Sequence, residues 1–147
     1  MKIRINEVSG QEDTEVIINC KKMDEEIMKI ITLLHVYDRK LTGIKGGQTY
    51  ILEAAKILYI DTVDKKTFLY TDNEVYETPL KLYELEEQLE AVGFFRAGKS
   101  VLINFNEIKA LKSDFNGRIL VTMNNEEKLM VSRQYAVTIK KKLDIVG

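Results

Sequence analysis

The sequence predicts a mainly β fold of the α+β class, in which a β-sheet domain follows a short β-β-α N-terminal extension. Short runs of β-branched and aromatic residues follow one another closely between residues 49 and 131, which is typical of strands. Apolar residues recur at helical spacing in only a few stretches. The 147 residues suffice for one ordinary domain with an appendage and exclude two large domains.

Residues 1–40 are predicted to form the extension. Residues 2–8 alternate between apolar and polar side chains, and a β-branched run at residues 15–20 follows the turn-prone sequence SGQED, which indicates two short strands. A helix is expected from Asp24 to Asp38, because acids fill its first turn and one apolar stripe follows. The stripe comprises Ile27, Ile30, Ile31 and Leu34. The pattern leaves open whether this extension packs on the main domain or mediates dimerisation.

The main domain is predicted to cover residues 41–147, because glycine and threonine breakers in LTGIKGGQT indicate a boundary loop near Arg39 to Gly43. One helix is expected over residues 80–92, where leucines recur opposite a row of glutamates, and another from Ser132, its N-cap, to Leu143. The strands of this domain are expected at residues 49–52, 57–62, 67–70, 74–78, 101–103, 107–113, 118–123 and 128–131.

The composition excludes several classes of function. Cys20 and His35 are the only cysteine and histidine, so no intramolecular disulfide and no zinc site can assemble, and no cofactor is expected. His35 lacks a serine or cysteine motif beside it, and the glutamates between residues 84 and 90 lie on a predicted solvated helix face, so no enzyme is indicated. The charged, alternating N-terminus resembles neither a signal peptide nor a membrane span, and a cytoplasmic protein is expected.

Three short segments place cations in predicted loops or at the ends of predicted elements. Their polar side chains are Lys65 and Lys66 in VDKK, then Arg96, Lys99, Ser100 and Asn104 in FFRAGKSVLIN, and finally Arg133 and Gln134 in VSRQY. Such side chains can donate to phosphates and reach base edges in the major groove of DNA, and a helix N-terminus adds backbone donors. For any single lysine, solubility of the surface is the competing explanation.

The order of these pieces resembles the LytTR family of bacterial DNA-binding domains. A strand ending in ILYID, a lysine-bearing turn, TDNEVYETPLKLYELEEQL, FFRAGKSVLINFNEIKAL, a hairpin and VSRQYAVTIKKKL follow one another over roughly residues 41–147. The most specific part is an aromatic residue and an arginine followed by serine, an apolar stretch and asparagine, together with a later Ser-Arg-x-Tyr.

The resemblance implies a mostly β domain that reads successive major grooves of double-stranded DNA through loops rather than through a helix-turn-helix. Family members usually bind as two molecules on promoter direct repeats, so a homodimer on DNA is implied. By position, the contacts fall at Lys65 or Lys66, at Lys99 with Arg96 and Ser100 beside it, and at Arg133 or Gln134. Asn104 also matches a family signature, although a short asparagine at a strand end is more often a structural residue.

Two further expectations concern regulation and an alternative function. A receiver domain needs far more chain than the residues before Leu41, so the sequence is closer to the stand-alone LytTR regulators of Gram-positive bacteria. These are often encoded beside a small membrane protein that restrains them, which is an expected partner from family habit alone. From Leu41 onward there are fifteen Lys and Arg and fifteen Asp and Glu. This neutral balance favours one alternative, a protein-interaction module that keeps the fold without binding DNA.

Overall fold

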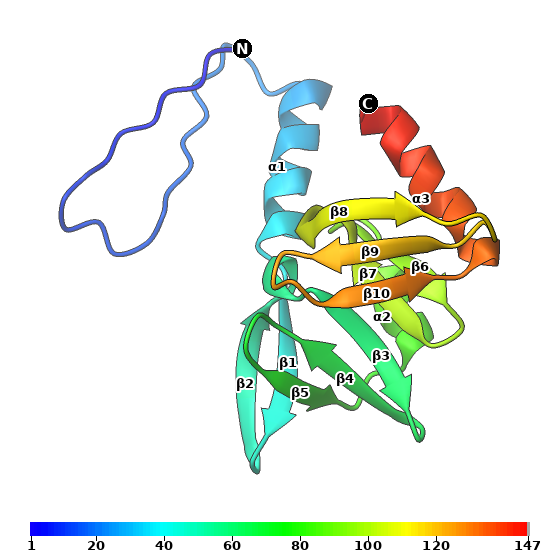
Figure 1. The fold of residues 1–147 in the computed structure, drawn as a ribbon. Helices are drawn as coiled ribbons and strands as arrows, with labels where there is room; N and C mark the ends of the chain where they lie inside the picture. Colours follow the sequence, from blue (N-terminus) through cyan, green and yellow to red (C-terminus); the bar gives the residue numbers. More distant parts are fainter. Residues whose placement is uncertain (147) are drawn as a thin grey trace.

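The computed structural model describes residues 1–146, in which helices and strands occur only from Glu25 onward (Figure 1). The helices are α1 (Glu25–Tyr37), α2 (Leu82–Leu89) and α3 (Arg133–Val146), with short 3₁₀ turns at Ala54–Lys56 and Phe105–Glu107. The strands are β1 (Lys40–Lys45), β2 (Gln48–Glu53), β3 (Tyr59–Val63), β4 (Lys66–Tyr70), β5 (Val75–Thr78), β6 (Phe94–Gly98), β7 (Val101–Asn104), β8 (Ile108–Ser113), β9 (Ile119–Met123) and β10 (Lys128–Val131).

The strands form two antiparallel sheets. The larger sheet has the order β2-β1-β5-β4-β3-β7-β6, and the smaller one has the order β10-β9-β8. Figure 1 shows the smaller sheet lying across the β6–β7 end of the larger one, with α3 beside it. The predicted mainly β, α+β fold is therefore confirmed.

Alternation along the central strands produces two cores. On β3, Ile60 faces a cluster that includes Leu85 and Leu89 of α2, whereas Tyr59 faces the opposite cluster with Val121 of β9 and Ile139 of α3. Neighbouring residues of a strand point to opposite faces, so one central sheet can supply both cores. The part of the large sheet formed by β3, β7 and β6 is thus buried between α2 on one side and the small sheet with α3 on the other.

Two strands of the main domain lie where loops were expected. The stretch LTGIKGGQT forms β1, the following turn and the start of β2, and Gly46 and Gly47 adopt φ angles of 56° and 76°. A two-residue hairpin turn requires positive φ at both positions, which glycine adopts without strain. The glycines therefore end a strand here instead of marking a boundary loop. The other unexpected strand is β6, in which a register shift between Arg96 and Gly98 interrupts the alternation.

The predicted strands at residues 2–8 and 15–20 are absent, and this part of the prediction is wrong for the structure of the single chain. Residues 1–24 contain no helix or strand, although Asp24 accepts a hydrogen bond from the Ile27 backbone N–H at 3.0 Å and so caps α1. A two-stranded hairpin with nothing packed against it is marginal in water. The alternating pattern is present, but no neighbouring surface covers it in this structure.

Candidate nucleic-acid interface

The first cationic segment lies at the tip of the β3–β4 hairpin. Val63 pairs with Lys66, and Asp64 and Lys65 form the two-residue turn with φ angles of 51° and 66°. Lys65 therefore projects at the tip, whereas Lys66 begins β4 and lies 3.9 Å from the Glu77 carboxylate. The structure thus distinguishes the two alternatives, because only Lys65 is free of a carboxylate partner among the described residues.

The base of the same hairpin is held by an aromatic pair, in which Tyr59 is buried and Tyr70 half-buried. The rings of Tyr59 and Tyr70 stack with centroids 4.2 Å apart, and the Tyr70 hydroxyl donates to Asp61 at 2.9 Å. Burial raises the pKa of Tyr59, and it raises that of Tyr70 to about 12, with the Asp61 carboxylate adding to the effect. Burial also raises the pKa of Asp61. These contacts keep β3 and β4 in register and so fix where Lys65 projects.

The second segment forms the β6–β7 turn, directly beside the first. Gly98 pairs with Val101, which leaves Lys99 and Ser100 as the turn residues. The Ser100 carbonyl accepts a hydrogen bond of 3.0 Å from the backbone N–H of Thr62 in β3. Both turns therefore lie at the same end of neighbouring strands, and Lys99 and Ser100 are exposed there.

Arg96 supports this turn from behind. Its Nε and Nη2 donate to Glu86 Oε1 of α2 at 3.2 and 2.8 Å, and its Nη1 donates to the Lys99 carbonyl at 2.7 Å. Only 19% of the side chain is exposed. A guanidinium with its donors occupied on two sides acts as a brace between helix and turn. Because Glu86 and the Lys99 carbonyl share this guanidinium, one acid of α2 lies near the second cationic segment.

The two turns enclose a shallow depression of about 400 Å³. It is lined by Thr62, Lys65, Thr67, Lys81, Leu82, Tyr83, Arg96, Lys99 and Ser100. Lys65, Lys81 and Lys99 form no ion pair within the part of the chain that the structure describes. Three unpaired ammonium groups around one concave surface make a local positive potential, although the whole chain is nearly neutral.

The third segment is held on the same side of the molecule by a backbone hydrogen bond to β6. The backbone N–H of Ser132 donates to the Ala97 carbonyl at 3.3 Å, two residues before Lys99. Helix α3 begins at Arg133, directly after Ser132 as predicted, and both Arg133 and Gln134 are exposed. The Arg133 stem lies so close to Gly117 that a Cβ on that glycine would be 2.8 Å from it. Figure 1 shows the three segments along one edge of the domain.

The comparisons with known proteins agree with this geometry. Residues 47–144, about two thirds of the chain, match the family described as LytTr DNA-binding domain. The chain belongs to the LytTR family. The solved LytTr DNA-binding domain of a Bacillus cereus protein, described as a methyl-accepting/DNA response regulator, superposes with a TM-score of 0.67 at 29% identity, over 71% of this chain and 95% of that one. The family match and the solved domain together support a DNA-binding regulator.

Curated relatives extend the likeness beyond the LytTR domain itself. Proteins of Staphylococcus aureus strains NCTC 8325 and COL, each named an uncharacterized HTH-type transcriptional regulator, are 26% identical over 147 residues, which is 99% of both chains. In the described residues of this chain no two helices follow each other directly, because strands separate all three. Residues 1–146 therefore contain no helix-turn-helix.

Asn104 has a structural role in this LytTR domain, which corrects its inclusion among the predicted contacts. Its side chain is fully buried, and Nδ2 donates to the carbonyls of Ala55 and Ile57 at 3.1 and 3.0 Å. The Oδ1 atom accepts from the Asn106 backbone N–H at 3.1 Å. With donors and acceptor occupied inside the fold, nothing of Asn104 faces outward. The residue joins the start of β3 to the turn that follows β7.

Sequence reasoning missed Lys81 and Tyr83, which line the depression from the start of α2. The helix was treated as a solvated acidic element because four glutamates follow Lys81, and the first of these, Glu84, accepts from the Lys81 backbone N–H at 3.2 Å. The available signal was the position of Lys81 at the positive end of the helix, the end where anions bind.

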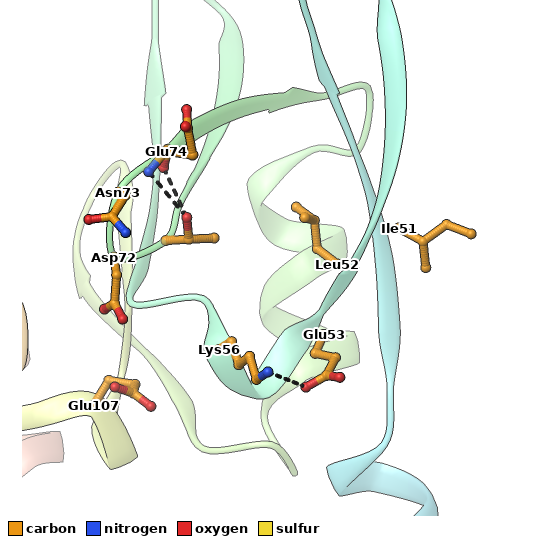
Figure 2. A pocket seen from close by; sticks show the side chains of 9 residues that line it. Ile51, Leu52, Glu53, Lys56, Asp72, Asn73, Glu74 and Glu107 are labelled. Atoms are coloured by element: carbon orange, nitrogen blue, oxygen red, sulfur yellow. Dashed lines mark hydrogen bonds and ion pairs between the residues drawn. The ribbon is translucent and has the colours of Figure 1, made fainter. Parts of the chain in front are cut away.

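A second hollow, of about 570 Å³, has the opposite character (Figure 2). Asp72 and Glu74 line it from the β4–β5 turn, and Glu107 lines it from the turn after β7. Lys56 is paired with Glu53 at 3.3 Å, and its hydrogen bond and charge lower the pKa of that glutamate. An acidic surface repels phosphate, so this hollow is not a candidate for contact with DNA.

Neither a metal site nor a membrane span is found in the described part of the chain. No group of three or more His, Cys, Asp or Glu side chains among these residues could hold a metal ion. None of their helices is both long enough and apolar enough to cross a membrane.

Proposed function

We propose that this chain is a transcription regulator that binds double-stranded promoter DNA in the major groove through three loop segments. The observation that carries the proposal is the meeting of Lys65, Lys99 and the start of α3 along one edge, around unpaired lysines. Family membership and the names of the staphylococcal relatives support it. In this proposal the protein works in the bacterial cytoplasm, and two molecules occupy a pair of direct repeats.

The residues take different roles in this proposal. Lys99 makes the central base contact, since it lies at the exposed turn between the other two segments. Lys65, with Lys66 beside it, reaches DNA from the hairpin tip, and Ser100 adds a hydroxyl donor. Arg133 or Gln134 makes the third contact, where the α3 N-terminus favours a phosphate. Arg96 positions Lys99 through the Glu86 bridge and is not itself a base contact.

The test is an anisotropy titration of the full chain against DNA from its own promoter region at several salt concentrations. Lys99→Ala should weaken specific binding by about 1–3 kcal/mol. Lys112→Ala removes an equally exposed lysine from β8 and serves as the matched control. Unchanged affinity in Lys99→Ala would refute the central contact.

The same titration can test whether Arg96 acts only by positioning Lys99. If Arg96 acts only through the Lys99 turn, Arg96→Ala should weaken binding by about 1 kcal/mol and add little to the loss in Lys99→Ala. Fully additive losses, with a lower salt dependence in Arg96→Ala, would mean that Arg96 itself contacts DNA.

The alternative function is a protein-interaction module on the same fold. The balanced charge of residues 41–147 and the Glu86 carboxylate beside the Lys99 turn favour it. It predicts no retention on any DNA fragment at low salt and capture of a protein partner through the same edge. A small membrane protein that restrains the regulator is the partner expected from the stand-alone LytTR regulators that the chain resembles, and membrane vesicles carrying the neighbouring gene product would test it.

A further inference from the structure

The N-terminal part of the chain exposes far more apolar surface than the rest of the molecule. Within residues 1–37, no side chain is buried, and Ile18, Ile27, Ile30, Ile31 and Val36 are only half-buried. The exposed large apolar side chains of this part are Met1, Ile3, Ile5, Val8, Val16, Ile17, Met23, Met28, Leu33, Leu34 and Tyr37. Exposed apolar side chains in this number indicate an interaction surface.

Residues 2–8 and 14–20, here called the two arms, form an open loop that projects away from the sheets (Figure 1). Within residues 1–20 as described, hydrogen bonds are confined to the connecting turn. There the Gln11 backbone N–H donates to the Val8 carbonyl at 3.2 Å, and the Gln11 side-chain amide donates to the backbone carbonyl of Asp13 at 2.8 Å. The arms thus have strand-like sequences and unpaired backbone groups. Both properties favour pairing with further strands.

The two sheets with α2 and α3, from residue 40 onward, are here called the body. Helix α1 contacts the body only through its C-terminal end. Val36 packs against the core, and the Arg39 side chain donates to Gln88 at 3.4 Å just beyond the helix. The stripe of Ile27, Ile30, Ile31 and Leu34 repeats at helix-pairing spacing but contains no buried residue. The helix therefore presents an apolar stripe that the described part of the chain leaves half-buried or exposed.

Charge is segregated along the arms in a way that identifies the partner. Four acids and no cation lie around the turn, namely Glu7, Glu12, Asp13 and Glu15. Four cations flank the far ends of the arms, namely Lys2, Arg4, Lys21 and Lys22. A closed hairpin would gather the acids at its tip and the cations at its base, whatever its register. Two such units side by side in opposite directions place each acidic tip against a basic base.

Helix α1 repeats the same polarity. Its first turn contains Glu25 and Glu26, and Arg39 follows its last turn without an acidic partner among the described residues, whereas Lys40 pairs with Asp38 and Glu53. Antiparallel pairing with an identical helix brings the acids of each first turn beside Arg39 of the other copy and aligns the two helix dipoles favourably. The arms and the helix thus favour the same two-fold arrangement. A single isologous interface satisfies both, because each copy offers the same surface.

We propose that the arms and α1 form a two-fold symmetric interface with a second copy of this chain, in which the arms pair as strands and the helices pack antiparallel near Ile31. The inference goes beyond DNA binding and does not depend on it. It assigns the unburied apolar stripe to a homodimer that forms in the absence of DNA, with the LytTR bodies carried outside the interface.

The mass of the full chain in solution tests the interface. Sedimentation and light scattering without DNA should give twice the 17.0 kDa chain mass. Ile5→Glu and Ile31→Glu should each shift the equilibrium to monomer, by at least tenfold in dissociation constant, with unchanged thermal unfolding of the body. Ile51→Glu is the matched control, since Ile51 is 75% exposed and Ile5 is 85% exposed, but Ile51 lies on β2.

Cross-linking tests the orientation. In a Cys20→Ser background, which removes the only cysteine, Ile31→Cys should form a disulfide-linked dimer on mild oxidation. Ile27→Cys and Leu34→Cys should cross-link when mixed but not alone, because antiparallel helices separate identical end positions by roughly 10 Å, beyond disulfide reach. Cross-linking of each variant with itself would overturn the antiparallel arrangement.

Three results in solution would overturn the interface as a whole. One is a full chain that stays monomeric, including one whose arms fold back on its own sheet. Another is a dimer that Ile5→Glu and Ile31→Glu leave intact. The third is a dimer that Ile51→Glu dissociates, which would move the interface to the β2 edge. None of these results bears on the DNA titration, so failure of either proposal is recognisable by itself.

Discussion

The β-sheet body and the N-terminal extension contain similar strand patterns but reach different structures. In β3 a run of apolar residues buries Ile60 completely, whereas in the first arm an alternating strand pattern leaves Ile3 and Ile5 83% and 85% exposed. The intrinsic strand preference of the residues therefore does not explain why one region forms strands and the other does not. A strand needs neighbours that cover its apolar face, and within one chain only the body provides them.

The helices repeat this contrast. α2 has only eight residues, yet Leu82, Leu85 and Leu89 are buried against the large sheet. α1 has thirteen residues and none that is buried. Because most helix stability in proteins comes from packing an apolar face, length and capping alone do not explain why α1 is helical. The comparison therefore indicates that the extension lacks a surface to pack against, whereas the core of the body is complete.

The largest expected effect comes from matched isoleucines in the two regions. Ile60→Ala should lower the free energy of unfolding by about 2–5 kcal/mol, because it leaves a cavity in a closed core. Ile5→Ala should change the unfolding of the body by less than about 0.5 kcal/mol. Guanidinium denaturation followed by circular dichroism measures both. Similar losses in the two variants would remove the distinction between the regions.

The next effect concerns the buried amide of Asn104. Asn104→Ala should cost about 2–3 kcal/mol, because the carbonyls of Ala55 and Ile57 lose their donor inside the fold. Asn73→Ala, at an exposed position in the β4–β5 turn, is the control. The folded fraction of Asn104→Ala should keep its DNA affinity. A stable variant with weakened binding would restore Asn104 to the DNA contacts.

The local pattern predicted much of the body but not its assembly. Strands β2 to β5 and β7 to β10 follow from alternation and turn residues. β1 was missed because Thr42 and Gly43 resemble a linker, and β6 was missed because its bulge near Arg96 breaks the alternation. The order β2-β1-β5-β4-β3-β7-β6 depends on contacts between distant residues, which no local window contains.

The candidate site shows the same division. Cations in predicted loops singled out the three segments, and the resemblance to LytTR domains assigned them to DNA contact. The choice between Lys65 and Lys66 needed the turn geometry, because two adjacent lysines look alike in sequence. The bracing role of Arg96 depends on Glu86 of a different element, so it became visible only after α2 was packed against β6. Burial likewise separated Asn104 from the exposed polar residues.

The smallest expected effect contrasts tyrosines of the two regions at alkaline pH. The pKa of Tyr70 is raised to about 12, chiefly by burial and further by Asp61, whereas an unfolded tyrosine ionises near about pH 10. Between these values the unfolded chain has lost the proton that the folded chain still holds, so stability should fall as pH rises through this window. Tyr70→Phe should flatten that decline.

The control for this pH dependence is Tyr37→Phe, since Tyr37 at the end of α1 is 72% exposed and contributes no buried hydroxyl. Denaturation midpoints measured from about pH 9 to about pH 12 compare the two variants with the parent chain. If Tyr37→Phe flattened the decline as much as Tyr70→Phe, ionisation at the extension would be coupled to folding. The extension would then be part of the cooperative unit, and the contrast between a closed body and an open N-terminal part would fail.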